Sequence, residues 1–252
     1  MATLTPDERE RYDRQIMIKG WGEAGQRKLK RTSVFIAGAG GIGSAVSLYL
    51  AAAGVGRIRI VDHDKVELNN LNRQVLHCDE DVGQPKVSSA ATKLRKLNPN
   101  VKIETDEITI TETNISRLVA GFGLIIDALD NLPARYLLNK AAIEKSVPLF
   151  HGAINGFEGR AMTIIPGKTA CLACVYRGAI PEGKFPVVGV TPAVIGCIQA
   201  TEVIKYITGL GELLINTLLV YDGLSMKFSE FKVRKDPKCR YCAHLAPEGK
   251  AD

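Results

Sequence analysis

Short apolar runs alternate with longer amphipathic stretches between residues 31 and 154. Runs such as Ser33-Val34-Phe35-Ile36-Ala37 have the length of buried strands. The stretches between them carry apolar residues at helical spacing. We expect strands at 33–37, 57–61, 101–105, 123–127 and 147–150, and helices at 42–53, 85–97, 113–120 and 133–145. This alternation predicts βαβ units and an α/β fold with a doubly wound, mainly parallel sheet.

The pattern changes on both sides of this region. Thr5-Pro6-Asp7-Glu8 combines a capping hydroxyl, a proline and two acids, which predicts the start of a helix. After Ile154 the pattern becomes α+β, with a strand at 156–165, a helix at 193–208 and strands at 214–221 and 225–233. We therefore expect three parts without a sharp linker: an N-terminal helical segment at 1–30, the parallel-sheet region at 31–154 and a C-terminal region at 155–252.

The composition is that of a globular protein, and the lack of an apolar signal core in the N-terminal residues leads us to expect a cytoplasmic setting. The 252 residues are 46% hydrophobic and 24% charged, which suffices to bury a substantial core. The 33 basic and 27 acidic residues are mixed along the chain, so the net charge of +6 does not by itself predict a nucleic-acid partner. No apolar stretch approaches the length of a membrane span. In a cytoplasmic setting, six cysteines indicate metal or redox chemistry rather than disulfides.

A glycine-rich turn follows the first expected strand. Gly38, Gly40, Gly41 and Gly43 lie between that strand and the next helix. Glycines let the backbone approach phosphates closely, and the start of a helix supplies free N–H groups and a positive dipole. Asp62 follows the second strand, 19 residues beyond Gly43, where a carboxylate can hydrogen-bond a ribose hydroxyl. The combination predicts a Rossmann-like nucleotide site for either a nicotinamide or flavin dinucleotide or ATP.

The segment after Asp62 distinguishes between these nucleotides. Asn70, Arg73, Gln74 and Lys86 lie on an expected loop and at the start of the following helix. Hydride transfer requires no arginine and lysine at this place. An adenylating enzyme does require them, because phosphate charge must be neutralised while a carboxylate attacks the α-phosphorus. Each side chain alone is typical of a protein surface, but together they favour ATP.

Two acids end the fourth expected strand, in the sequence Asp127-Ala128-Leu129-Asp130-Asn131. In this architecture, ligands bind at the carboxyl ends of the strands. A carboxylate there can hold Mg²⁺ together with several waters. We therefore expect Asp130 to bind Mg²⁺. The alternative is that Asp130 caps the helix that begins near Pro133.

Four cysteines form two CxxC pairs, separated by 64 residues. Two chelating pairs predict one tetrahedral zinc site, and four thiolates leave no open coordination position, so the metal should be structural. Two alternatives are a pair of disulfides and a redox-active CxxC. The four residues are Cys171, Cys174, Cys239 and Cys242.

Several of these motifs, in this order, resemble one family. They are Arg11-Tyr12-Asp13-Arg14-Gln15, the glycine-rich run at 38–43, Asp62, Asn70 to Gln74, Lys86, and Asp127 to Asn131. From about residue 5 to 243, the chain resembles the adenylation domain of the ThiF/MoeB/HesA family, the bacterial and archaeal relatives of ubiquitin-activating enzymes. In character it is closest to MoeB.

The resemblance implies a role for each motif. Asp62 would hold the ribose, Arg73 and Lys86 the phosphates, and Asp130 the Mg²⁺. Arg14 would reach the β- and γ-phosphates from the partner subunit of a homodimer. The C-terminal region would bind a ubiquitin-like sulfur-carrier protein ending in Gly-Gly and hold the zinc. The rest of the nucleotide site would be Gly38, Gly40, Gly41, Gly43, Asn70, Gln74 and Asn131.

Thioester-forming members of this family often have a reactive cysteine after the first CxxC pair. Here no cysteine lies between Cys174 and Cys197. Cys197 falls in an apolar helical pattern, and Cys78 lies beside the expected active-site loop. We therefore expect the adenylate itself to be the product, with a sulfur-donor enzyme acting next, in molybdopterin or thiamine synthesis.

Other functions stay open on the sequence. The same chemistry can act on a peptide or a modified tRNA base. A non-catalytic subunit would bind a ubiquitin-like protein and lend only Arg14 to another chain, but such a subunit needs no complete set of ATP residues. A nicotinamide oxidoreductase would need a hydride-transfer site, and the sequence suggests none.

Overall fold

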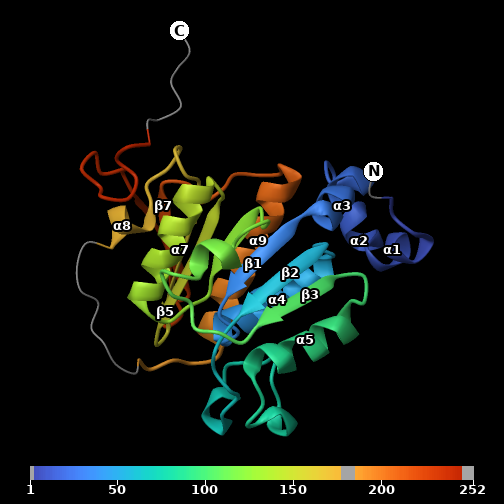
Figure 1. The fold of residues 1–252 in the computed structure, drawn as a ribbon. Helices are drawn as coiled ribbons and strands as arrows, with labels where there is room; N and C mark the ends of the chain where they lie inside the picture. Colours follow the sequence, from blue (N-terminus) through green and yellow to red (C-terminus); the bar gives the residue numbers. More distant parts are fainter. Residues whose placement is uncertain (1–2, 177–184, 246–252) are drawn as a thin grey trace.

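A mixed sheet of eight strands forms the centre of the part of the chain described by this computed structural model, residues 3–176 and 185–245. The strands are β1 (Ser33–Ala37), β2 (Arg57–Val61), β3 (Lys102–Asp106), β4 (Leu124–Asp127), β5 (Leu149–Asn155), β6 (Glu158–Ile164), β7 (Thr217–Asp222) and β8 (Lys227–Lys232). Their order is β3-β2-β1-β4-β5-β6-β7-β8 (Figure 1). β1 to β5 are parallel, and β6 to β8 continue the sheet in antiparallel pairs. This confirms the predicted fold class.

Helices cover both faces of the sheet, as in a doubly wound fold. One face carries α4 (Gly41–Ala53), α5 (Lys86–Leu97) and α9 (Val190–Thr208). The other carries α6 (Ile115–Leu118), α7 (Leu132–Lys145) and α8 (Leu172–Val175), and α7 lies in front of the sheet in Figure 1. None of the helices in the described part of the chain combines the length and apolar character that crossing a membrane requires.

The C-terminal region begins with a hairpin. β5 extends to Asn155, beyond the strand expected at 147–150, and the chain then turns at Gly156 and Phe157 into β6. Gly156 has a φ of +60°, a conformation that glycine adopts without steric cost. The strand expected at 156–165 is thus the second arm of this hairpin, and it leads the sheet from parallel into antiparallel pairing.

The helix expected at 113–120 is limited to α6. The side chain of Asn114 accepts a hydrogen bond from the Thr111 amide (2.9 Å) and donates one to the Thr109 carbonyl (2.8 Å). These bonds hold the preceding residues in a turn, because asparagine competes with helical hydrogen bonding.

The N-terminal segment consists of three short helices, α1 (Pro6–Arg11), α2 (Asp13–Ile16) and α3 (Gly22–Arg31). The predicted start of α1 is confirmed, because Thr5 and Glu8 form a reciprocal capping box. The side chains of Gln15 and Gln26 both donate to the carbonyl of Ala53, at 2.8 and 2.9 Å. The segment therefore packs at the C-terminal end of α4, whereas the glycine-rich turn lies at its N-terminal end.

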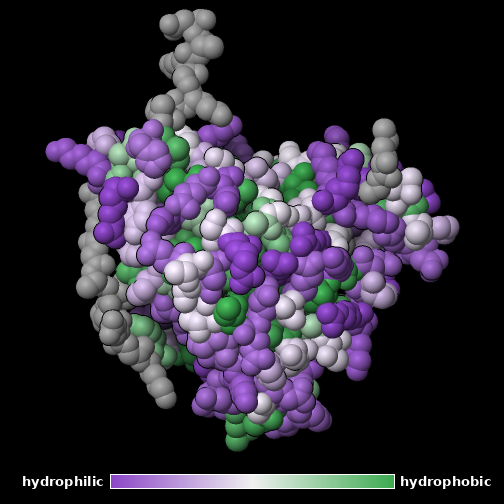
Figure 2. Space-filling view, viewed as in Figure 1, coloured by the Kyte–Doolittle hydropathy of each residue, from purple (hydrophilic) through white to green (hydrophobic). Residues whose placement is uncertain are grey.

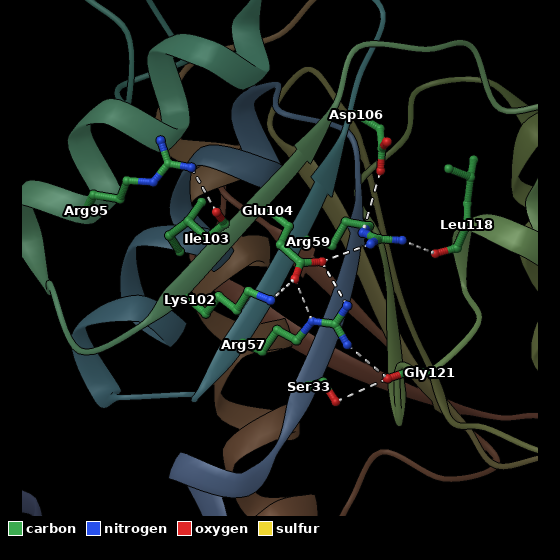
Figure 3. Close-up of polar contacts among 10 residues, drawn as sticks. All are labelled: Ser33, Arg57, Arg59, Arg95, Lys102, Ile103, Glu104, Asp106, Leu118 and Gly121. Atoms are coloured by element: carbon green, nitrogen blue, oxygen red, sulfur yellow. Dashed lines mark hydrogen bonds and ion pairs between the residues drawn. The ribbon is translucent and has the colours of Figure 1, made fainter.

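On the α7 side of β2 and β3, a cluster of charged residues replaces an apolar layer (Figure 3). The Glu104 carboxylate accepts hydrogen bonds from Arg57 (2.8 and 3.0 Å) and Arg59 (2.8 Å), and pairs with Lys102 (2.7 Å). The two guanidinium groups lie over the ring of Phe122, at 4.2 and 4.8 Å from its centroid. Hydrophilic residues predominate on this side of the molecule (Figure 2).

This cluster predicts a pH-dependent contribution to stability. Hydrogen bonding to Arg57, ahead of Lys102 and Arg59, lowers the pKa of Glu104 to about 2. The stabilisation is fully present above the carboxyl pKa of the unfolded chain and is lost as the pH falls from about 4.5 to about 2. We expect Glu104→Gln to lower the free energy of unfolding by about 1–3 kcal/mol at pH 7.

Urea unfolding of the variant and the wild type at pH 7 and pH 3 measures this effect. The difference between them should shrink markedly at pH 3. Glu112→Gln is the matched control, because Glu112 pairs with Lys140 on the exposed surface, and it should change stability little at either pH. A difference for Glu104→Gln that stays constant with pH would contradict the assignment.

Candidate functional site

The chain turns sharply where β1 ends, at the carboxyl edge of the parallel strands. Gly38 has a φ of +101°, and its amide donates to the Val61 carbonyl (2.8 Å). A Cβ at this position would lie 2.6 Å from the Ala128 carbonyl oxygen, and one at Gly43 would lie 2.1 Å from that of Gly38. Only glycine fits at these two positions, and the turn therefore presents backbone groups rather than side chains.

Asp62 holds this turn from the end of β2. Its Oδ2 accepts the amide proton of Ala39 (2.7 Å), and its Oδ1 accepts that of Asp64 (2.9 Å). The carboxylate thus lies beside the glycine-rich turn, where the sequence places it. It is half-buried, so one side of it faces solvent.

The connection between β2 and α5 follows the turn closely. It contains two 3₁₀ helices, η1 (Leu68–Asn70) and η2 (Asp79–Asp81). Gln74 is buried beside Gly40, and its Oε1 has no hydrogen-bond partner among the described residues. The half-buried Arg73 donates to the Asn69 carbonyl (2.7 Å) and to the Asn72 side chain (3.0 Å). A buried polar atom without a partner is typical of a ligand site.

Asn70 has a local structural role in this connection. It is buried, its Oδ1 accepts the Glu67 amide (3.1 Å), and its Nδ2 donates to the Asn69 side chain (2.7 Å). These bonds fix the 3₁₀ turn that precedes Arg73. Contact of Asn70 with a nucleotide stays a prediction.

Lys86 begins α5, and 8% of its side chain is exposed. Its Nζ donates to the Asp64 carboxylate at 2.8 Å. Because the Asp64 amide is bonded to Asp62, and Asp62 to the Ala39 amide, the lysine is connected to the turn through three hydrogen bonds. A phosphate that binds Lys86 would compete with Asp64 for this cation.

The two acids at the end of β4, Asp127 and Asp130, have different surroundings. Asn131, not Asp130, caps α7, because its Oδ1 accepts the Ala134 amide (3.0 Å). This excludes the capping alternative for Asp130. The exposed Asp130 carboxylate accepts one long hydrogen bond from Asn131 (3.4 Å) and has no other partner among the residues that the structure describes, so it could bind a cation. Asp127, in contrast, is fully buried and occupied by protein donors.

Arg14 lies far from the other predicted site residues. It is exposed on α2, and it forms no hydrogen bond or ion pair within residues 3–176 and 185–245. Its neighbour Gln15 donates to the carbonyl of Ala53, the last residue of α4, whereas Gly40 and Gly41 lie at the N-terminal end of that helix. Since α4 has 13 residues, these ends are about 20 Å apart. The structure does not bring Arg14 to the glycine-rich turn of its own chain.

A buried polar network at the end of β4 escaped the sequence analysis. Asp127 Oδ2 bonds to His151 Nδ1 (2.7 Å), and His151 Nε2 bonds to the Tyr176 hydroxyl (2.9 Å). Arg135 lies 3.6 Å from Asp127, and Gln199 on α9 donates to the Asp127 carbonyl (2.8 Å). The network joins helices on both faces of the sheet to one strand end. It fixes the backbone that leads to Asp130.

The protonation state of this network follows from its partners. Burial lowers the pKa of His151, although hydrogen bonding to Asp127 opposes this effect. The ring is therefore neutral, with Nδ1 donating to the carboxylate and Nε2 accepting from Tyr176. The only sequence signal for it was a histidine within an apolar strand, and such a residue has no local partner to reveal its role.

The four cysteines converge although they come from distant segments. All four are buried, and their sulfur atoms lie within 4.8 Å of one another. The Sγ–Sγ distances are 3.9 Å for Cys171–Cys174 and 3.6 Å for Cys171–Cys239 and Cys174–Cys242. All four are free thiols, so the disulfide alternative is not supported.

This cluster fits a tetrahedral metal ion. Zn–S bonds of about 2.3 Å place tetrahedral sulfur ligands about 3.8 Å apart. Burial raises the pKa of Cys171 to about 11 and also raises that of Cys242. A divalent cation would offset this cost by stabilising the thiolates. The Asp236 amide donates to Cys174 Sγ (3.4 Å), and backbone amides commonly donate in this way to metal-bound thiolates.

Comparison with known proteins places this arrangement in a family. The model of the ThiF family matches residues 12–241, a range that contains the glycine-rich turn and every strand described above. The chain belongs to the ThiF family. This confirms the resemblance that the sequence motifs indicated.

Close relatives of this ThiF-family chain carry functional names. It is 43% identical to the SAMP-activating enzyme E1 of Haloferax volcanii over 246 residues, covering 95% of this chain and 91% of that protein. It is 41% identical to the sulfur carrier protein adenylyltransferase of Thermus thermophilus, covering 94% and 92%. The crystal structure of E. coli MccB with ATP superposes with a TM-score of 0.82 at 26% identity, covering 92% and 74%.

The cysteine cluster of this ThiF-family chain leads to a prediction about zinc. We expect one zinc per chain by elemental analysis. Cys239→Ser should remove it and lower the melting temperature strongly, because metal binding at a structural site contributes directly to folding. Cys197→Ser, at a half-buried thiol outside the cluster, should keep the metal. Zinc-free preparations with an unchanged melting temperature would refute the assignment.

Proposed function

We propose that this chain is an ATP-dependent adenylyltransferase that activates the C-terminal Gly-Gly carboxylate of a ubiquitin-like sulfur-carrier protein. The observation that carries the proposal is a glycine-rich turn held by Asp62, with Lys86 joined to Asp62 through Asp64 and the Arg73 backbone packed beside Gly41. Two cations beside such a turn suit a triphosphate better than a dinucleotide. The names of the relatives from Thermus thermophilus and Haloferax volcanii support the same activity.

The reaction joins a carboxylate to AMP. A carrier carboxylate oxygen attacks the α-phosphorus of ATP, the bond to the bridging oxygen of the β-phosphate breaks, and pyrophosphate leaves. The chain acts by positioning and charge stabilisation, without a protein nucleophile. Backbone amides of Gly40 and Gly41, at the start of α4, would bind phosphate oxygens. Asp62 would accept a ribose hydroxyl.

Charge neutralisation falls to the side chains around the turn. Lys86 would exchange its partner Asp64 for a phosphate oxygen, and Arg73 would add a second cation. Asp130 would hold Mg²⁺, which offsets phosphate charge when bound. With Gln74 and Asn131, these residues form the nucleotide site of the proposal.

The carrier would dock on the antiparallel part of the sheet, within residues 155–252. β8 is exposed along its whole length, and the turn before it carries Leu224 and Met226 with 78% and 72% of their surface exposed. Phe228 and Phe231 on β8 are also exposed. Large apolar side chains on an exposed edge are typical of a surface that binds another protein.

The two spare thiols suggest that the adenylate is the product released. Burial raises the pKa of Cys197, and hydrogen bonding to Glu80 and Asp81 raises that of Cys78. Both thiols are therefore poor nucleophiles at neutral pH. A separate sulfur-donor enzyme would then attack the acyl-adenylate, in molybdopterin or thiamine synthesis. Activation of a peptide is the second candidate. E. coli MccB, which is 25% identical to this chain, was crystallised with a form of MccA.

Pyrophosphate–ATP exchange tests the function. We expect exchange only with a small protein ending in Gly-Gly, and none after removal of that dipeptide. Lys86→Ala should lower the rate at least about 100-fold, because it removes charge stabilisation at the phosphates. Lys96→Ala, at an exposed position of the same helix, should retain the wild-type rate. Calorimetric binding of NAD without ATP, or exchange with short peptides alone, would contradict the proposal.

The position of Arg14 predicts a site shared between two subunits of a homodimer. Arg14→Ala and Lys86→Ala should each be inactive alone. A mixture of the two should regain about a quarter of the wild-type activity, since half of the dimers would be mixed and each would hold one intact site. Mass spectrometry of tagged chains would verify subunit exchange. Exchanged mixtures that stay inactive would show that Arg14 does not act across the interface.

A further inference from the structure

A buried line of hydrogen bonds runs from α5 to the glycine-rich turn. The His77 ring is 5% exposed, and its Nε2 bonds to the Ala39 carbonyl (3.1 Å). Its Nδ1 bonds to the Ser89 hydroxyl (2.8 Å), which in turn bonds to the Lys93 ammonium (3.0 Å). Lys93 also pairs with the buried carboxylate of Asp81.

The chemistry of the two ends sets the direction of every bond in this line. A carbonyl oxygen only accepts, so His77 Nε2 carries the proton and donates to Ala39. A lysine ammonium only donates, so Ser89 accepts from Lys93. The Ser89 hydroxyl also lies near the Asp81 carboxylate, but a neutral ring with its proton on Nε2 can only accept at Nδ1, so the Ser89–His77 bond runs from the hydroxyl to the ring. Burial lowers the pKa of His77, so the ring stays neutral and keeps one donor and one acceptor. The imidazole therefore has a single tautomer.

The bond from His77 orients a peptide group of the turn. The Ala39 carbonyl and the Gly40 amide belong to the same planar trans peptide, so they point in opposite directions. With the carbonyl drawn inward by His77, the Gly40 N–H points outward at the start of α4. The Ala39 amide on the other side is held by Asp62. The Gly40 amide donates to no group in the part of the chain that the structure describes.

We propose that His77, held by Ser89 and Lys93, is a positioning residue that keeps the Ala39–Gly40 peptide turned so that the Gly40 amide meets the phosphates of ATP. This inference rests on the proposed function. If the peptide rotated, the carbonyl oxygen would face the phosphates, and repulsion would replace a charge-assisted hydrogen bond. Because glycine at position 40 allows such rotation at low cost, the turn needs an external brace.

Two substitutions at one position test this role. The amide nitrogen of His77→Gln can reach the place of Nε2 and still donate to Ala39. The shorter side chain of His77→Asn reaches only the place of Nδ1, so it keeps the Ser89 contact and loses Ala39. We expect His77→Asn to weaken ATP–Mg²⁺ binding about 10-fold, and His77→Gln by less than about threefold. Calorimetry gives both affinities, and thermal unfolding gives the stability of each variant.

A second measurement determines the orientation of the Ala39–Gly40 peptide. Crystal structures of the ATP-free wild type and both variants should show the Ala39 carbonyl turned inward in the wild type and His77→Gln, and rotated in His77→Asn. Should His77→Asn not fold, Ser89→Ala replaces it, with an expected loss of affinity of about two- to fivefold, because it removes one hydrogen bond to the ring.

The outcomes separate the two proposals. Equal loss of ATP affinity in His77→Asn and His77→Gln, or an unrotated peptide in His77→Asn together with wild-type affinity, would overturn the role of His77. A lower melting temperature without any change in ATP affinity would show that His77 contributes only to packing, and would also overturn its positioning role. A wild-type protein that binds no ATP would instead contradict the proposed function, and the crystal structures would still report on the brace.

Discussion

At Gly38 the chain runs so close to the backbone after β4 that no side chain fits, and an added Cβ would lie 2.6 Å from the Ala128 carbonyl oxygen. This contact draws the carboxyl ends of β1 and β4 together and lets α4 start directly after the turn. Because the turn carries almost no side chains of its own, the segment from Asp62 to Lys86 and the start of α9 pack closely against its backbone, and only Gly40 and Gly41 are partly exposed. The buried groups behind the turn then decide which way its peptide groups point.

Much of this arrangement is predictable from local sequence. Alternating apolar runs located the parallel strands, and the glycines with Asp62 predicted a turn that the structure brings beside that carboxylate. The remaining contacts have no local signature, because they join residues far apart in the chain. His77 and Ala39 are 38 positions apart, and His151 and Asp127 are 24 apart. The sequence around a single histidine is the same whether its ring fills the core, orients a peptide group or contacts a ligand. Only the fold shows which group it contacts.

The ends of elements were harder to predict for a related reason. Asp130 and Asn131 are adjacent and both can cap a helix, and the choice between them depends on which side chain the backbone aims at the Ala134 amide. The hairpin between β5 and β6 does have a local signal, because Asn155-Gly156 favours a tight turn, but the strand expected at 156–165 begins at that glycine and takes no account of the dipeptide. Family resemblance supplied the assignment of roles to Arg14, Arg73 and Lys86, which spacing alone does not provide. The structure adds that Arg14 and the turn occupy opposite ends of one helix.

The cysteine cluster has a consequence for how the chain unfolds. Its two pairs enclose a segment of 64 residues that includes α9, β7 and β8. An ion held by both pairs ties the ends of that segment together, and this reduces the number of conformations open to the unfolded chain. The entropy that folding must otherwise overcome to close so long a loop is then already removed. Release of the ion would free the C-terminal strand pair to separate before the parallel core, so the order of unfolding would depend on metal occupancy.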